Sequence, residues 1–327
     1  MTSSRSVPRV ARRTTTRIAC LALTSSVVSL LGQQAFVDAG QLFRDLEVLS
    51  ADDMSGRLPG THGGDKARQY VVGRFKEVGI QPIDASYERP FTFAGSDGRE
   101  RPGTNIIGVI RGERSRDRYI AVTAHYDHLG VRAGQIYNGA DDNASGVAAL
   151  LAVGAYFSRN RPEHSLLLAA TDAEELGLHG ARDLVRRPPV PLSSIAVNVN
   201  VDMIGRDATN RLFAVGTHQY PFLKPYLEKV AQPPVKLVFG HDVPGSRAED
   251  WTRDSDHYVF HEAGIPFIYF GVEDSEQHHQ PTDDSATILK EFFTGATSTV
   301  IAAVRALDSN LDTIAKRRHG GQHASTP

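Results

Sequence analysis

Two stretches of the sequence decide how the chain is interpreted. The first, IAVTAHYDH over residues 120–128, is an apolar run rich in β-branched residues that ends in His-x-Asp. The second, GADDNASG over residues 139–146, leads directly into the apolar pattern VAALLAV. The first pattern is typical of a buried strand, and the second of a turn that opens a helix. A strand that ends in histidine and a helix start that carries carboxylates together supply half of a metal site.

The overall composition is that of a soluble globular protein. The chain has 327 residues, 40% of them hydrophobic and 23% charged, which predicts one large domain or one domain with a small insertion. The formal net charge is -2, and without the five arginines that precede Asp38 it becomes about -7. A basic footprint for nucleic acid is therefore absent. Cys20 is the only cysteine, which excludes a disulfide within the chain and, once the first segment is removed, thiol chemistry.

Residues 1–39 are predicted to be a secretory signal. The arginine-rich start is followed by a moderately apolar stretch from Ile18 to Leu31, the layout of a charged n-region and an h-region. The apolar run is too short and too polar for a stable membrane span. We therefore expect a secreted or periplasmic protein. A disordered N-terminal tail is the alternative, and Arg12-Arg13 leaves twin-arginine export open.

Beyond this segment, strand and helix patterns alternate along the chain. Helices are predicted over residues 41–49, 66–78, 147–157, 222–231 and 288–307, and strands over residues 87–93, 104–111, 119–124, 165–170, 195–201, 212–215, 235–239 and 265–270. Asp65 is expected to cap the second helix and Gly79 to end it, after a loop over residues 55–64. The alternation predicts an α/β fold, with a mixed, largely parallel central sheet and helices on both faces. Residues 40–312 would form this domain and residues 313–327 a disordered basic tail.

Five side chains that can bind metal occur where the chain leaves predicted strands. They are His125, Asp142, Glu175, Asp202 and His279. Ligands of such sheets bind beyond the carboxyl ends of the strands. Zinc takes imidazole nitrogen and carboxylate oxygen, and a pair of zinc ions needs a shared carboxylate with further ligands for each ion. Five ligands fit that count, so we expect two Zn²⁺ per chain, although cobalt or manganese would accept the same side chains.

Two further acidic positions have predicted roles beside the ligands. Glu174 and Glu175 are adjacent carboxylates after a buried strand, a costly arrangement unless a cation neutralises one of them. If Glu175 binds metal, Glu174 points elsewhere and can act as the general base. Asp127 lies two residues after His125, too close along the chain to bind the same ion easily. We therefore expect Asp127 to orient the His125 ring by accepting its other N–H.

Taken singly, each of these features has an ordinary structural explanation. His125 would be a satisfied strand-end histidine, Asp141-Asp142 a helix cap and Glu174-Glu175 a solvated turn. Asp202 would cap a strand end, and the segment with His278 and His279 would be a polar loop. Five such coincidences at successive strand exits are far less expected than one shared metal site.

In these stretches the sequence resembles the secreted dizinc aminopeptidase family, which also contains glutamate carboxypeptidase II. The resemblance covers roughly residues 40–310. The matching motifs are AHYDH (124–128), GADDNASG (139–146), DAEELG (172–177), NVDMIG (200–205) and HQPTD (279–283), with SDH (255–257) and AGIP (263–266) similar as well. Together and in this order they are highly specific, whereas any one of them alone is weak.

The resemblance implies a zinc-peptidase fold and a role for each candidate. Asp142 would bridge the metals, His125 and Asp202 would hold one of them, and Glu175 and His279 the other, with Glu174 as the base. Asp142 is favoured over Asp141 because it lies four positions before Gly146, and His279 over His278 because of its spacing to Thr282 and Asp283.

One departure concerns substrate contacts. Several relatives have a tyrosine immediately before the last ligand histidine, where this chain has His278. His257, Tyr258 and His278 are therefore the candidates for contact with the substrate or its oxyanion.

The sequence thus predicts a secreted metallo-aminopeptidase that hydrolyses N-terminal residues from peptides through a water activated by two zinc ions. Its partners would be peptides and not nucleic acids. A glutaminyl cyclase-like zinc enzyme is the first alternative, although the presence of His125 favours the two-metal hydrolase. A catalytically silent binding ectodomain is the second.

Overall fold

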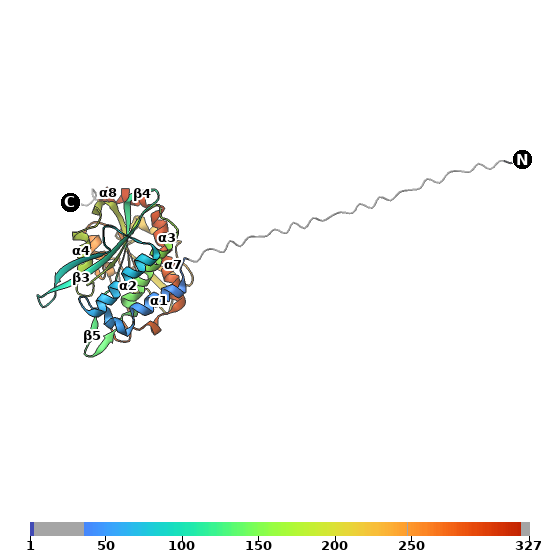
Figure 1. The fold of residues 1–327 in the computed structure, drawn as a ribbon. Coiled ribbons are helices and arrows are strands. Elements are labelled where there is room, and N and C mark those ends of the chain that lie inside the picture. Colours follow the sequence, from blue (N-terminus) through green and yellow to red (C-terminus); the bar gives the residue numbers. More distant parts are fainter. Residues whose placement is uncertain (3–35, 247, 322–327) are drawn as a thin grey trace. The chain divides into compact units, whose positions relative to one another are not determined.

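The computed structural model describes residues 1–2, 36–246 and 248–321. A nine-stranded sheet runs through residues 36–321, and a small hairpin lies apart from it (Figure 1). The strands of the sheet are β1 (Gln81–Pro82), β2 (Glu88–Ala94), β3 (Glu100–Ile110), β4 (Ser115–His125), β7 (His164–Thr171), β8 (Ile195–Val201), β9 (Arg211–Val215), β10 (Lys236–Phe239) and β11 (Phe267–Gly271), and the hairpin is β5 (Gly130–Arg132) and β6 (Gln135–Tyr137). The helices are α1 (Ala39–Leu49), α2 (His62–Val78), α3 (Gly146–Arg159), α4 (His179–Arg186), α5 (Lys224–Leu227), α6 (His257–Glu262), α7 (Lys290–Asp308) and α8 (Leu311–Gly321).

Four neighbouring strands in the middle of the sheet are parallel. They follow the order β7-β4-β8-β11, and the remaining strands extend the sheet on either side, with antiparallel pairing where β3 meets β7 and where β9 meets β11. The carboxyl ends of the four parallel strands therefore meet at one edge. The predicted α/β class, with a mixed and largely parallel sheet, is confirmed.

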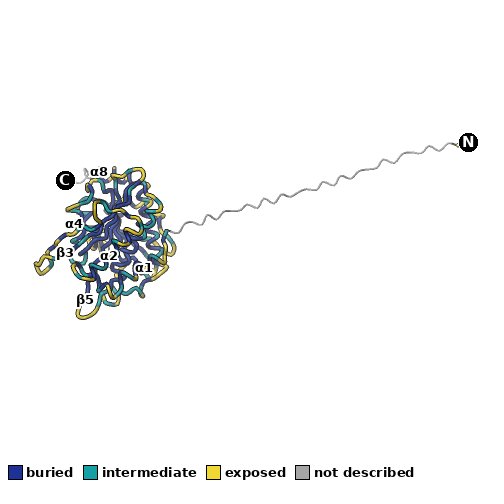
Figure 2. The backbone as a smooth tube through the Cα atoms, viewed as in Figure 1, coloured by how far each residue is buried: buried dark blue, intermediate teal, exposed yellow. Residues whose placement is uncertain are grey.

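Helices cover both faces of the sheet. Ile120, Val122 and Ala124 of β4 pack in one core with residues of α1, α2, α3 and α7, which lie together in Figure 1. Tyr119 and Ala121 of the same strand face a second core that includes residues of α4 and α6. The parallel strands are buried on both faces and run through the dark blue interior in Figure 2, which explains why their sequences are almost continuously apolar.

The start of α2 differs from the prediction. The helix begins at His62, and the Thr61 hydroxyl, in place of Asp65, accepts the capping hydrogen bond from the Gly64 amide at 3.3 Å. The glycines that suggested a loop are helical because the turn packs tightly against the preceding segment. A Cβ at Gly63 would lie 1.9 Å from the Met54 carbonyl oxygen. Gly79 ends the helix with a φ of 82°, as expected.

Two predictions near the carboxyl end of the chain were wrong. The helix expected over residues 222–231 ends at Leu227, after which the Gln232 amide bonds the Thr299 hydroxyl of α7. Of the tail expected to be disordered, residues 313–321 are helical as part of α8, and residues 322–327 lie outside the described residues. Leu311 and Ile314 are buried, and Arg318 donates to the Leu192 carbonyl at 2.9 Å, so packing overrides the polar composition. Helices α4 and α6 were not predicted at all.

The predicted signal of residues 1–39 falls mostly outside the described residues and stays a prediction. None of the described helices is long and apolar enough to cross a membrane.

Candidate metal centre

His125 and Asp202 form the first group of candidate ligands. His125 is the last residue of β4, and Asp202 directly follows β8, the neighbouring parallel strand. The His125 Nε2 atom lies 3.3 Å from Asp202 Oδ1 and 3.3 Å from Asp142 Oδ1. The Ser255 hydroxyl donates to the other Asp202 oxygen at 2.7 Å and fixes this carboxylate.

His279 and Glu175 form a second group on the other side of Asp142. The His279 Nε2 atom lies 3.1 Å from Glu175 Oε2 and 3.1 Å from Asp142 Oδ2. Glu175 lies in the turn after β7, and His279 in the loop after β11. The two oxygens of Asp142 thus face different groups. The structure brings all five predicted ligands together at the carboxyl edge of the parallel strands.

Asp283 holds the loop that carries Asp142 through hydrogen bonds to its backbone. The backbone amides of Asp141 and Asp142 donate to the Asp283 carboxylate at 3.0–3.1 Å. Arg206 is ion-paired to Asp141, at 2.9 Å, and to Asp283. The Asp141 carboxylate therefore points away from the ligand groups, and it also accepts a hydrogen bond from the Gly205 amide at 2.7 Å.

Arg57 ties the same loop to the end of β4. This fully buried guanidinium donates to the carbonyl oxygens of Leu49, Tyr126, Asn138 and Gly139 at 2.5–2.9 Å. Burial lowers the pKa of Arg57 to about 10, against the opposing field of Asp142 and Asp127. The positive charge of Arg57 attracts the nearby carboxylates, and its hydrogen bonds fix the backbone of the segments that carry them.

Asp127 contacts both halves of the site. It is fully buried, and its carboxylate accepts the backbone N–H of Glu174 at 3.0 Å and that of Glu175 at 3.4 Å. One of its oxygens lies 3.5 Å from His125 Nδ1, and its carbonyl oxygen lies 3.2 Å from the same nitrogen. Asp127 therefore positions the Glu174–Glu175 turn in addition to the histidine.

Glu174 is partly buried close to the ligands, and it belongs to none of the candidate metal groups among the described residues. Its carboxylate lies 3.9 Å from His125 Nε2, and 11% of its side chain is exposed. Burial raises the pKa of Glu174 well above its ordinary value, and repulsion from Asp202 and Asp256 adds to the increase. A carboxyl that binds a proton this readily can exchange one with water or a leaving group.

The donor set has the chemistry of a zinc site. Among the described residues, three groups of His, Asp and Glu atoms are close enough to hold an ion, and every one of them includes Asp142. A tetrahedral zinc ion with bonds of about 2.0–2.1 Å has ligand–ligand separations of roughly 3.3 Å, close to the distances around Asp142. His128, which was not predicted as a ligand, lies with Nδ1 2.5 Å from Glu175 Oε1. Both atoms are buried without a hydrogen-bond partner among the described residues, but they lie closer together than two ligands of one tetrahedral zinc ion.

The candidate ligands line a cavity of about 460 Å³. His278, one of the three predicted substrate contacts, lies in its wall, whereas His257 and Tyr258 are not among the described residues that line it. His257 is fully buried, with Nε2 2.9 Å from the Trp251 carbonyl oxygen, and burial lowers its pKa to about 3. The wall also contains Trp251 and Tyr269, whose positions no motif revealed.

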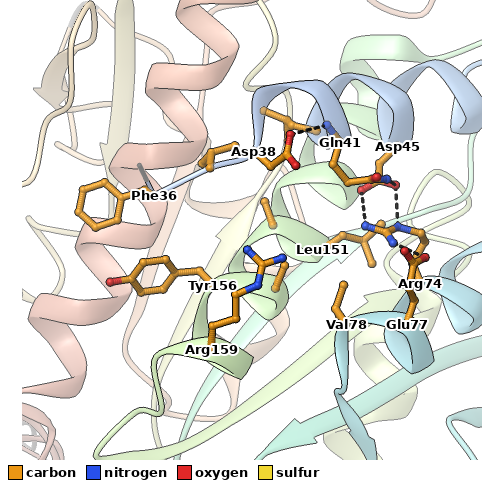
Figure 3. Close-up of a pocket in the computed structure, with 14 residues that line it drawn as sticks. Phe36, Asp38, Gln41, Asp45, Arg74, Glu77, Val78, Leu151, Tyr156 and Arg159 are labelled. Carbon is orange, nitrogen blue, oxygen red and sulfur yellow. Dashed lines mark hydrogen bonds and ion pairs between the residues drawn. The ribbon is translucent and has the colours of Figure 1, made fainter. Parts of the chain in front are cut away.

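A second cavity lies between α1, α2 and α3 (Figure 3). Its volume is about 330 Å³, and it shares no described lining residue with the cavity of the candidate metal centre. The buried ion pair of Arg74 with Asp45, at 2.8 Å, forms part of its wall. These side chains satisfy one another and add nothing to the candidate metal centre.

Comparison with known proteins identifies the family. The model of peptidase family M28 matches residues 105–304, the part of the chain that contains all five candidate ligands. The chain belongs to peptidase family M28. The fold class that the sequence predicted is the one seen in structures of this family.

Two curated M28-like relatives are named for peptidase activity. Aminopeptidase YwaD of Bacillus subtilis (strain 168) is 31% identical over 260 residues, covering 74% of this chain and 52% of that protein. A "Probable zinc metalloprotease" of Pyrenophora tritici-repentis (strain Pt-1C-BFP) is 28% identical over 277 residues, covering 69% of this chain and 61% of its own length. The chain thus spans between about half and three-fifths of the length of these two relatives.

A solved structure extends the fold comparison beyond the peptidases. Glutaminyl cyclase from Porphyromonas gingivalis superposes with a TM-score of 0.68 at 20% identity, covering 83% of this chain and 98% of that one. This likeness shows that the fold is shared.

Proposed function

We propose that this M28 family member is an aminopeptidase with two zinc ions and with Glu174 as its general base. The observation that carries the proposal is the position of Asp142 between two sets of donors, one on each of its oxygens. Its relative YwaD is named an aminopeptidase, which supports the same reaction class here.

Each residue of the centre has a defined task in this proposal. His125 and Asp202 would hold one ion, Glu175 and His279 the other, and Asp142 both. Zinc there would supply the Lewis acidity that activates water and polarises the scissile carbonyl. Glu174 would take the proton from the attacking water and pass it to the leaving amine, which its raised pKa suits. Asp127 would hold Glu174 in place through the backbone N–H groups of the turn.

The substrate would be the free end of a peptide. A cavity of about 460 Å³ lies within the range of ligand pockets, roughly 300–1,000 Å³. Its wall carries Glu249, Asp254 and Asp274 in addition to the candidate ligands, so the site is strongly negative and suited to a substrate with a free α-ammonium group. The pattern of residues 1–39 supports action outside the cytoplasm.

The test is hydrolysis of a panel of aminoacyl p-nitroanilides, free and N-acetylated, with and without a chelator, alongside metal analysis. We expect cleavage of free substrates only, inhibition by chelation and about two zinc ions per chain. Cleavage of acetylated substrates at the same rate would rule out aminopeptidase action. A protein that binds no zinc and cleaves nothing would be a binding ectodomain.

Glutaminyl cyclase activity is the second candidate, because a cyclase shares the fold over most of the chain. A peptide with N-terminal glutamine separates the two reactions. An aminopeptidase releases free glutamine, whereas a cyclase releases ammonia and leaves a pyroglutamyl peptide of nearly unchanged length.

A further inference from the structure

Tyr269 presents an unpartnered hydroxyl to the cavity of the candidate metal centre. The residue lies on β11, lines the cavity and is only 6% exposed. Among residues 36–246 and 248–321 no hydrogen bond involves its hydroxyl, and the hydroxyl oxygen is not one of the fully buried atoms that lack a partner. The hydroxyl oxygen is therefore open to the cavity, where water or a bound ligand can supply its partner. A donor left free in a ligand cavity is therefore a position where substrate can complete the bond.

The backbone beside Tyr269 is shaped to let the hydroxyl reach the site. Residues 269 and 271 of β11 share a face, and the second of them is a glycine. A Cβ at Gly271 would lie 2.6 Å from the Tyr269 hydroxyl oxygen and 3.0 Å from the Asp202 carbonyl oxygen. The hydroxyl thus extends across the missing side chain toward the end of β8, where the first ligand group begins.

The ring of Tyr269 is held rigidly. The imidazole of His257 stacks on it, with centroids 4.5 Å apart and an interplanar angle of 14°. The Trp251 ring lies 6.2 Å away on the cavity side. Burial above all, with repulsion from Asp202 and Asp254, raises the pKa of Tyr269 well above its ordinary value.

The other candidates for contact with the oxyanion are less well placed. Both ring nitrogens of His278 already face carboxylates, since Nδ1 lies 2.9 Å from Asp274 and Nε2 lies 3.6 Å from Asp142. His257 bonds a carbonyl oxygen behind the cavity wall. The Tyr258 ring lies under the Arg253 guanidinium, at 5.4 Å, and is not among the described residues that line the cavity.

From this arrangement we infer that Tyr269 is a catalytic residue whose hydroxyl donates a hydrogen bond to the scissile carbonyl oxygen as it becomes an oxyanion. The inference rests on the proposed peptidase function. The proton stays on the phenol throughout, and the bond strengthens as negative charge develops on the substrate oxygen.

The decisive variant is Tyr269→Phe, which removes only the hydroxyl and keeps the stacked ring. We expect kcat on leucine p-nitroanilide to fall by roughly 10²–10³-fold, with KM within about threefold of wild type and zinc content unchanged. Tyr258→Phe is the matched control, since it removes a hydroxyl from a neighbouring tyrosine outside the cavity, and it should leave kcat unchanged. Gly271→Ala should reduce kcat as well, because its methyl group would displace the hydroxyl.

Binding of a stable tetrahedral anion gives a readout independent of turnover. Calorimetry with the phosphonic acid analogue of leucine should show affinity for Tyr269→Phe lower by a factor similar to the loss of kcat, while affinity for leucine itself changes little. Equal affinity of wild type and variant for the phosphonate, or loss of zinc from the variant, would overturn the role of Tyr269. If the wild type cleaves no aminoacyl substrate, the proposed function fails, and the phosphonate comparison still decides whether Tyr269 recognises a tetrahedral anion.

Discussion

Glu174 and Glu175 are neighbours in the chain with different surroundings. The Glu175 carboxylate faces His279 and His128, whereas the Glu174 carboxylate lies beyond the candidate metal groups and among other buried acids. Asp127 accepts both backbone N–H groups, so the turn cannot rotate and exchange the two side chains. One position is therefore suited to binding a cation and the other to carrying a proton.

This division predicts different outcomes for two equivalent substitutions. Glu174→Gln should lower kcat by about 10²–10⁴-fold while two zinc ions stay bound, because an amide cannot accept the proton of the attacking water. Glu175→Gln should lose zinc instead. Activity assays combined with metal analysis of both variants provide the measurement. Loss of zinc from Glu174→Gln alone would mean that the roles of base and ligand are reversed.

His257 links stability to pH. Burial lowers its pKa to about 3, so in the folded protein it stays neutral while the unfolded chain takes up a proton below its ordinary pKa of about 6.5. The stability that depends on neutral His257 is fully present above pH 6.5 and is lost as the pH falls toward 3. The expected slope is about 1.4 kcal/mol per pH unit for this group.

His257→Phe isolates that contribution, because phenylalanine keeps an aromatic ring against Tyr269 and cannot titrate. Urea unfolding of both proteins in the presence of chelator, between pH 5 and 7.5, should show wild type losing stability more steeply below pH 6.5. Parallel pH dependences of the two proteins would contradict the assignment.

At the level of elements, the site depends on segments whose backbone is held in place by hydrogen bonds from Arg57. Arg57, which follows α1 and precedes α2, binds carbonyl oxygens at the end of α1, just after β4 and in the loop before α3. His125 is the last residue of β4, and Asp142 lies in the loop before α3. A single guanidinium therefore determines whether two candidate ligands from different parts of the chain keep their separation.

Arg57→Met should destabilise the fold by at least about 3 kcal/mol, because several buried carbonyl oxygens would lose their donor. It should also weaken zinc binding. Arg44→Met on the exposed side of α1 is the control and should change stability by less than about 0.5 kcal/mol. Urea unfolding and zinc titration measure the two effects. Unchanged zinc affinity in a destabilised Arg57→Met would limit this residue to a structural role.

Elements with a local sequence pattern could be predicted, whereas those stabilised by contacts with distant parts of the chain could not. The parallel strands were predictable because burial on both faces leaves an apolar run with an abrupt polar end, as at His125. Helix α8 was not, because it is stabilised by the Arg318 contact with carbonyl oxygens far away in the chain. Tyr269 was missed for a similar reason. Its residue type is ordinary for a strand, and the role that we propose for it depends on Gly271 and on strands that lie much earlier in the chain.

For the whole molecule, the candidate metal centre is a concentration of negative charge within the fold. Asp142, Glu174, Glu175 and Asp202 are all buried or nearly so, and they lie at the junction of the parallel strands with the loops that follow them. Without cations these groups repel one another, and divalent ions relieve that repulsion when they bind the folded chain.

Removal of zinc should therefore destabilise the whole domain. We expect a chelator to lower the Tm by at least about 5 °C, roughly 2 kcal/mol or more for a domain of this size, and added zinc to restore it. Asp142→Asn should abolish this response, because Asp142 belongs to every candidate metal group in the part of the chain that the structure describes. Differential scanning fluorimetry with and without chelator is sufficient. A wild-type Tm that is indifferent to the chelator would contradict a zinc centre.

The modest size of the cavity determines which polypeptides such an enzyme would spare. A space of about 460 Å³ accepts a few atoms of extended backbone with one side chain, whereas an intact helix with its side chains is about 10–12 Å across. Chain termini that are tucked into a folded neighbour would be protected by their own structure. Frayed ends and short fragments would be cleaved. The folded state of a substrate protein, and not a dedicated inhibitor, would therefore limit its digestion.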